Sequence, residues 1–360
     1  MFSKFVRRWC FPANTPIYSS PHLQRSWRMS MAQPLDRATL RAIAERALDE
    51  WDICATELEL ISISENTVFR IDTDTDETYA LRIHRPDYHN LAELNSEQQW
   101  TAALKRAGIG VPLPRLTREG HGYATVPVPG STETRHVGIV EWFEGVTLSS
   151  IIVQAPDMRT LALHFNQLGR IAARIHNQAV SWQVPEDFQR HAFDADGFMG
   201  DTPFWGPFWV LPELKASERE HILNTRRAIH RTLSDYGKGS EIYSLIHADL
   251  HPHNLLVNGD QLHVIDFDDS GFGWHQYELA VALDAYRKPP HFKVARDALI
   301  AGYRSERPLS DEAIELLPMF LLIRSLALLG WLHERPEHNK GDRVRNLIQS
   351  ACKQAEALGI

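Results

Sequence analysis

Residues 245–269 read LIHADLHPHNLLVNGDQLHVIDFDD, and this stretch decides how the rest of the chain is interpreted. Two short apolar runs lie on either side of Asn258-Gly259. Asn-Gly between such runs is the strongest short-range signal of a β-hairpin. An antiparallel hairpin brings Asn254, just before its first strand, next to Asp266, just after its second.

The ends of this predicted hairpin carry groups that suit a metal ion. The amide oxygen of Asn254 and the carboxylate of Asp266 are hard ligands of the kind that Mg²⁺ prefers, with its other ligands coming from water and phosphates. Asp249 lies on the preceding loop, close enough to orient or deprotonate an attacking hydroxyl. A metal held by Asn and Asp beside an Asp base is the arrangement that phosphoryl transfer requires.

The pattern His-x-Asp-x₄-Asn followed by Ile-Asp-Phe-Asp resembles the catalytic and metal loops of the aminoglycoside phosphotransferase and choline kinase superfamily. It is also similar to the corresponding protein-kinase loops. The similarity extends over about residues 58–329 and points to the subgroup of type II homoserine kinases and the bacterial stress-response kinase. The resemblance implies Mg²⁺ and ATP as cofactors and assigns roles as follows: Asp249 as catalytic base, His247 as a brace of the catalytic loop, Asn254 and Asp266 as Mg²⁺ ligands, and Asp268 as a further group at the metal or the substrate.

The same loop also allows a zinc site to be considered. His247, His251 and His253 lie close to Asp249 in the sequence. However, their order differs from the His-x-His-x-Asp-His of zinc hydrolases, and Pro252 disturbs any helical pairing of the histidines. We therefore interpret His251 and His253 as loop residues or as neighbours of the ligands.

Composition narrows the class of protein. A length of 360 residues favours two lobes over a single core, and the formal net charge of −8 argues against a nucleic-acid partner. The cysteines Cys10, Cys54 and Cys352 lie far apart and favour a reduced compartment, which predicts a cytoplasmic protein. The longest apolar stretch, 316–332, contains Arg324 and is interpreted as a buried core helix, so no membrane partner is expected.

The first 35 residues differ from the rest. They are basic and rich in Ser and Pro, and no acidic residue precedes Asp36. This composition predicts a disordered leader, with Met29 or Met31 as the true start, or an organelle-targeting segment.

Hydrophobic periodicity predicts an α+β arrangement of two lobes, and the family resemblance implies that this is a protein-kinase-like fold. The predicted N-lobe covers 36–144 and is a small antiparallel sheet with one helix packed on it. A first helix near 36–51 precedes that sheet, whose strands are 58–63, 67–71, 79–83, 123–126 and 136–142, with the helix at 91–106. The predicted C-lobe covers 145–360 and is mainly helical, with helices at 161–180, 218–233, 277–286, 293–303, 311–333 and 342–358, and a single strand pair at 255–257 and 262–265.

The predicted N-lobe offers a cation for the phosphates of ATP. Arg82 stands in its strand where kinases of this type carry a lysine, and arginine can bind phosphate bidentately. Glu97, within a Ser-Glu-x-x-Trp-x-x-Ala-Leu pattern that resembles the family, is the expected ion-pair partner, and Glu93 is the alternative. His84 and Arg85 are other cations nearby, and an exposed Arg82 without a function is the simpler interpretation.

Two further segments are expected to contact the nucleotide. Ser64 and Thr67 lie in the turn that replaces a glycine-rich loop, although an ordinary hairpin turn has the same sequence. Glu141 and Phe143 lie on the strand that leads into the hinge between the lobes, where the family binds adenine.

The acceptor site is the least defined. Residues 193–209 are aromatic and rich in glycine, and Trp205, Trp209 and Trp274 could form a pocket wall or simply pack in the core. Asp269 and His275 follow the metal loop and could reach an acceptor.

These features predict an ATP-dependent phosphotransferase that moves the γ-phosphate to a hydroxyl of a small metabolite of amino alcohol, amino acid or sugar type. One alternative is a Ser/Thr protein kinase of the stress-response type, but no separate activation segment follows Asp266. Another is a nucleotide-binding pseudokinase or scaffold, suggested by Arg82 in place of lysine. The oligomeric state is not predicted.

Overall fold

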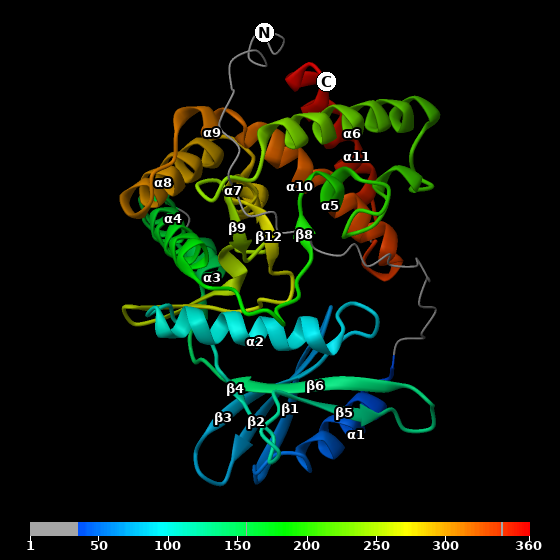
Figure 1. Ribbon diagram of the computed structural model, residues 1–360, viewed down its shortest axis with the longest axis vertical. Helices are drawn as coiled ribbons and strands as arrows, with labels where there is room; N and C mark the ends of the chain where they lie inside the picture. The colour runs from blue at the N-terminus through cyan, green and yellow to red at the C-terminus, as the bar shows by residue number, and fades with distance from the viewer. Residues whose placement is uncertain (1–34, 156, 340) are drawn as a thin grey trace.

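A computed structural model describes residues 35–155, 157–339 and 341–360. It has an N-terminal antiparallel sheet and a mainly helical C-terminal part (Figure 1). The predicted fold class is therefore confirmed. The predicted leader lies almost wholly outside the described residues.

The N-terminal sheet has the strand order β1-β2-β3-β6-β4, with β5 also paired to β6. All its neighbouring strands are antiparallel. Its strands are β1 (Ala55–Ile63), β2 (Thr67–Thr73), β3 (Thr78–Ile83), β4 (Pro114–Arg115), β5 (Tyr123–Pro127) and β6 (Thr134–Glu141).

Two helices accompany this sheet and serve different cores. Helix α1 (Arg37–Leu48) is capped by Asp36 and packs its apolar face into the core of the sheet. Helix α2 (Leu91–Arg106) lies between the sheet and the helical part (Figure 1). Its Trp100 and Leu104 belong to the core of the helical part. The helix that seals the sheet's own core is therefore α1, and α2 joins the two parts.

The helical part is built around α4 and α10. The buried face of α4 packs on α8, and α10 is almost entirely enclosed. Within the described residues, one helical stretch, 311–334, is long and apolar enough to cross a membrane, and 67% of its apolar 18-residue window is buried inside the structure. The prediction of a core helix here is confirmed. The helices are α3 (Leu148–Gln154), α4 (Met158–Ser181), α5 (Ala195–Met199), α6 (Ala216–Tyr236), α7 (His275–Leu283), α8 (His291–Glu306), α9 (Asp311–Glu315), α10 (Leu317–Glu334) and α11 (Arg343–Leu358).

The prediction of a single strand pair in the helical part is wrong. Two three-stranded sheets are present, with the orders β11-β10-β7 and β8-β12-β9. The four missed strands, of two to four residues each, show too little alternation to be recognised in the sequence, whereas the predicted pair flanks a turn signal. The strands are β7 (Val146–Thr147), β8 (Ala192–Phe193), β9 (Tyr243–Ile246), β10 (Leu255–Asn258), β11 (Gln261–Val264) and β12 (Gly271–Trp274).

The predicted hairpin is present in β10 and β11. Asn258 pairs with Gln261, so the two-residue turn is Gly259-Asp260, one position later than the Asn-Gly signal suggests. Gly259 has a φ of 58°, which glycine adopts without steric cost. The backbone N–H of Ile265 donates to the carbonyl of Asn254 at 3.0 Å. The two ends of the hairpin therefore lie side by side, as expected.

Candidate active site

The loop after β9 is held by a glutamate from α7. The carboxylate of Glu278 accepts hydrogen bonds from the backbone N–H groups of His247 at 2.9 Å and Ala248 at 2.8 Å. Ala248 has a φ of 65°, a conformation that is costly for a residue with a Cβ and that often occurs at functional sites. Burial raises the pKa of Glu278. These two bonds hold the loop in its strained form.

His247 connects the loop to the end of the hairpin. Its ring is fully buried, with Nε2 2.9 Å from the carbonyl oxygen of Ile265. Its Nδ1 accepts from the backbone N–H of Asp249 at 3.3 Å. These contacts fix a neutral ring that donates through Nε2, in agreement with burial that lowers its pKa. The geometry suits a brace.

The carboxylate of Asp249 is surrounded by donors. Arg324 donates to its Oδ1 at 2.8 Å, His251 Nε2 lies 3.2 Å from Oδ2, and Asn254 Nδ2 donates to Oδ2 at 3.1 Å. Although burial opposes ionisation, His251 and Arg324 hold the pKa of Asp249 well below its usual range. The carboxylate is therefore ionised and can accept a proton or a hydroxyl hydrogen bond.

Arg324 is a site residue that the sequence interpretation missed. It lies on α10, inside the apolar stretch 316–332. It is 9% exposed, and besides Asp249 it donates to the hydroxyl of Tyr277 at 3.5 Å. A buried arginine needs a partner, so its position in an apolar helix was the signal that could have revealed it.

Asn254 and Asp266 fit a Mg²⁺ ion by their donor chemistry. The side-chain Nδ2 of Asn254 is used on Asp249, which leaves its Oδ1 as an acceptor oxygen. The side chain of Asp266 is 51% exposed, and its φ is 67°. Its surroundings limit hydration and raise its pKa to about 6, with Arg82 opposing and Asp268 adding to the shift. One amide oxygen and one carboxylate at the end of a hairpin match the ligands that Mg²⁺ takes.

Arg82 lies at the centre of three carboxylates. Its guanidinium is 3.1 Å from Glu97, 3.2 Å from Asp266 and 3.6 Å from Asp268. Only 13% of its side chain is exposed, so the interpretation of Arg82 as an exposed residue does not hold. Although burial opposes its charge, the carboxylates of Glu97 and Asp266 raise the pKa of Arg82. The expected ion pair with Glu97 is formed, and Arg82 also reaches Asp266 in the metal loop, residues 265–268.

The alternative partner, Glu93, has another position. It is the third residue of α2, and its carboxylate accepts from the backbone N–H of Asn90 at 2.9 Å in a capping box. It also lies 3.5 Å from His89. Glu97, one turn later, is the residue that faces Arg82.

Asp268 is buried behind Arg82. Its Oδ1 lies 3.6 Å from His84 Nδ1, and although burial opposes ionisation, His84 and Arg82 lower the pKa of Asp268. The neighbouring backbone is fixed by Arg190, another residue that the sequence did not reveal. Arg190 donates to the carbonyls of Ser270 at 2.6 Å and Phe267 at 3.0 Å. The metal loop is therefore held from both sides.

The predicted nucleotide-contacting residues of the β1–β2 turn lie on different surfaces. Ser64 is exposed, whereas Thr67 pairs with Ile83 on the face that packs on α1. Glu65 of the same turn accepts from Arg335 at 2.8 Å. This bond connects the turn to Arg335, the residue that follows α10 in the helical part. Contacts of Ser64 and Thr67 with a nucleotide stay predictions.

The hinge residues are fixed by local contacts. Glu141 accepts from the backbone N–H of Leu113 at 3.0 Å, and Lys105 lies 3.4 Å from the same oxygen. Phe143 stacks on His263 of β11, with ring centroids 4.1 Å apart. A small pocket nearby is lined by residues of β3, α2, β5, β6 and the metal loop, including Arg82, Glu97, Tyr123, Val140 and Asp266.

The aromatic residues of the predicted acceptor region pack in the core. Trp205 and Trp274 are buried, and Trp209 lies under Arg226 at 4.1 Å. His275 is also buried, stacked on His176 with centroids 4.1 Å apart. These contacts agree with the interpretation that the three tryptophans pack in the core.

The zinc alternative at the loop does not agree with the contacts. His247 binds Ile265, His251 faces Asp249, and His253 Nε2 lies 3.1 Å from the Ser149 hydroxyl. These three rings have separate partners and do not converge on one point.

Comparison with known proteins gives the family. The profile of the phosphotransferase enzyme family matches residues 57–312. A homoserine kinase of Rhizobium etli (strain CIAT 652) is 29% identical over 235 residues, which are 64% of this chain and 64% of that kinase. A homoserine kinase of Chelativorans sp. (strain BNC1) is 31% identical over 230 residues, 62% of this chain and 63% of the relative. These matches therefore span less than two thirds of the length of the homoserine kinases.

Solved structures cover more of the chain. A microcompartment-associated aminopropanol kinase is 33% identical with a TM-score of 0.72, over 88% of this chain and 94% of that one. An amicoumacin kinase solved with AMP-PNP and Ca²⁺ has the same TM-score at 18% identity, over 87% and 93%, and supports the fold alone. The fold and the similarity are those of the kinase-type phosphotransferases. More narrowly, the chain belongs to the phosphotransferase enzyme family.

Proposed function

We propose that this protein transfers the γ-phosphate of ATP to a hydroxyl of a small metabolite of amino alcohol, amino acid or sugar type. The observation that carries the proposal is the ionised carboxylate of Asp249, held by Arg324 and Asn254 on the loop beside Asp266. The similarity to an aminopropanol kinase and to homoserine kinases supports an acceptor that carries both an amine and a hydroxyl.

Asp249 accepts the proton of the acceptor hydroxyl in this proposal, and Arg324 holds its carboxylate in place. Its low pKa makes it a weak base, so its main effect is to orient the hydroxyl toward the phosphate. Asn254 and Asp266 would hold Mg²⁺, with Asp268 close by. The ion, when bound, neutralises charge on the phosphates.

The N-terminal sheet supplies the nucleotide contacts in this proposal. Arg82, positioned by Glu97, binds phosphate oxygens, and the turn with Ser64 and Thr67 covers them. The hinge at Glu141 and Phe143 receives the adenine. We further propose lobes at 36–144 and 145–360 with ATP between them, in a cytoplasmic protein.

One observation argues against the pseudokinase alternative. Arg82 occupies the place of the usual lysine and already forms the ion pair with Glu97 at 3.1 Å. In this proposal Arg82 supplies the cation that phosphate binding requires.

The proposal is tested by incubating the protein with γ-labelled ATP and a panel of acceptors. The panel contains 1-amino-2-propanol, homoserine, choline, an amino sugar and a protein substrate. We expect a labelled ester of at least one small amino-containing acceptor. Label on the protein substrate alone would support the protein-kinase alternative, and nucleotide binding without any transfer would support the scaffold.

A further inference from the structure

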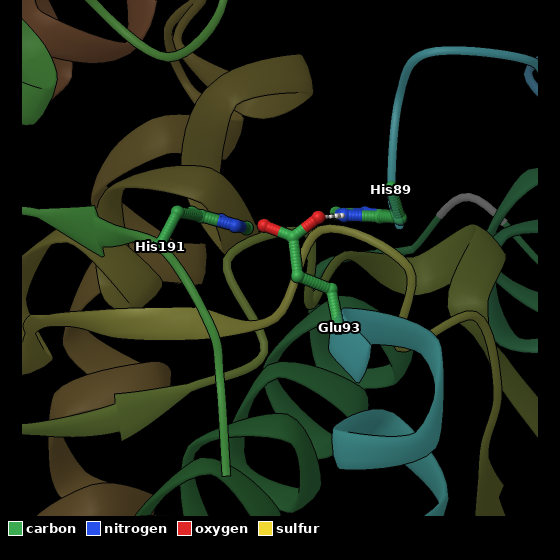
Figure 2. Close-up of side chains that lie close together, drawn as sticks. All are labelled: His89, Glu93 and His191. Atoms are coloured by element: carbon green, nitrogen blue, oxygen red, sulfur yellow. Dashed lines mark ion pairs between the residues drawn. The ribbon is translucent and has the colours of Figure 1, made fainter. Parts of the chain in front are cut away.

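Three potential metal ligands converge where α2 begins, and none of them is a predicted magnesium ligand. His89 precedes α2, Glu93 is on its first turn, and His191 directly precedes β8. Figure 2 shows the carboxylate of Glu93 between the two imidazole rings. One ligand atom from each residue lies within 4.8 Å of the others, and His89 Nδ1 is 3.5 Å from Glu93 Oε2.

Both imidazoles are oriented by backbone carbonyls on their other side. Nε2 of His89 lies 2.7 Å from the carbonyl oxygen of Asp268, and Nε2 of His191 lies 3.1 Å from that of Asp269. A ring that donates through Nε2 presents the lone pair of Nδ1. Metal-binding histidines are held in this way by a carbonyl or carboxylate behind them.

The cluster is also enclosed. The side chain of His89 is 2% exposed and that of Glu93 is 13% exposed. Among the residues that the structure describes, His89 Nδ1 has no hydrogen-bond partner, although it is a polar atom in a buried position. Buried polar atoms are rarely left in this state, and a cation between the rings would satisfy it.

We propose that His89, Glu93 and His191 bind a divalent first-row transition metal ion of the Zn²⁺ type. Two imidazole nitrogens and one carboxylate oxygen suit zinc, whereas Mg²⁺ prefers oxygen ligands alone. Metal–ligand bonds of about 2.0–2.1 Å place the ligand atoms of a tetrahedral site ~3.4 Å apart. The ligand atoms, which lie within 4.8 Å of one another, therefore have to close in by up to about 1.4 Å, which side-chain rotations can provide.

The position of the site gives it a structural consequence. His89 and Glu93 belong to the segment that begins α2, and His191 belongs to the helical part. The same rings hold the carbonyls of Asp268 and Asp269. A bound ion would thus join the two parts of the molecule and fix the metal loop from behind.

The test uses full-length protein without a histidine tag, treated with a chelator and titrated with Zn²⁺ alone in a calorimeter. Glu93→Gln keeps a capping residue at the third helix position but removes the anionic ligand, and His191→Ala removes one imidazole. His121→Ala is the matched control, because His121 is an exposed histidine 3.7 Å from a carboxylate, that of Glu119. Circular dichroism checks that each variant is folded.

We expect one Zn²⁺ per wild-type chain, an affinity at least about 10-fold lower in Glu93→Gln and His191→Ala, and no change in His121→Ala. No stoichiometric binding by the wild type, or equal binding by both site variants, would overturn the proposal. If the variants do not fold, anomalous diffraction from zinc-loaded wild-type crystals decides. A peak between His89 and His191 supports the site, and a peak only elsewhere contradicts it.

Discussion

The catalytic loop and the Arg82 cluster are built in opposite ways. Asp249, Asn254 and Asp266 come from one short segment, and a hairpin brings them together. Arg82 and Glu97 come from β3 and α2, and they meet the metal loop only because the chain folds back on itself. A local turn signal can predict the first arrangement, whereas the second depends on the packing of three distant elements.

The two regions also differ in how charge is balanced. Asp249 is surrounded by donors and has a lowered pKa, whereas the surroundings of Asp266, where the two regions meet, limit its hydration and raise its pKa to about 6, and Asp268 adds to this shift. Arg82 is the cation that relieves this crowding. The carboxylate of Asp249 is therefore kept ionised by its own donors, whereas the carboxylates around Arg82 depend on that one guanidinium.

The largest expected effect is that of Asp266→Ala, which removes a predicted metal ligand and one partner of Arg82. We expect kcat to fall by at least about 10³-fold, because a bound metal supplies several kcal/mol of charge stabilisation. A coupled assay of ADP formation at saturating ATP measures this loss. Activity within tenfold of the wild type would assign the metal to other residues.

Substitution of Arg82 comes next. Arg82→Met leaves Glu97 and Asp268 buried without their cation, and breaking a buried pair costs about 3–5 kcal/mol. We expect a lower free energy of unfolding in urea and a KM for ATP raised by about 100-fold. Arg82→Lys keeps the charge and should lose much less of both. Equal losses in the two variants would show that the planar guanidinium, rather than its charge, is required.

Glu278→Gln should have a smaller effect. The amide has one acceptor oxygen for the N–H groups of His247 and Ala248, so one of them loses its partner. An unsatisfied buried N–H costs about 1–3 kcal/mol, and we expect kcat to fall about tenfold through disorder of the loop. Glu278→Asp keeps the carboxylate and is the matched control. A fully active Glu278→Gln variant would show that the strained loop does not need this support.

Glu218→Gln, far from both regions, is expected to have the smallest effect on stability and none on kcat. Glu218 on α6 binds Arg345 on α11 at 2.8 Å, and the hydrogen bond from Arg345 lowers its pKa to about 2. Because the pKa of Glu218 is lower in the folded protein, its ionised form stabilises the fold at pH values above the unfolded pKa of 4.5. This stability is lost as the pH falls toward about 2. We expect about 1 kcal/mol less stability at neutral pH, after allowance for solvent screening, and unchanged kcat.

This comparison explains what could be predicted from the sequence. The hairpin, α2 and the buried α10 follow from local signals. The pair of Arg82 and Glu97 was expected from position in a resembling family, and the structure brings them together. Arg324 and Arg190 were missed because their partners, Asp249 and the carbonyls of the metal loop, lie far away in the sequence. Histidines adjacent in sequence suggested a metal, yet those that converge are His89 and His191.

The central claim is that Asp249 acts on the acceptor hydroxyl and does not itself bind the nucleotide. The direct test is Asp249→Asn, with γ-labelled ATP and the best acceptor of the panel, combined with a measurement of ATP binding by calorimetry. We predict that ATP affinity stays within threefold of the wild type and that labelled ester falls by about 10²–10⁴-fold. Labelled ester at the wild-type rate would contradict the assignment of Asp249.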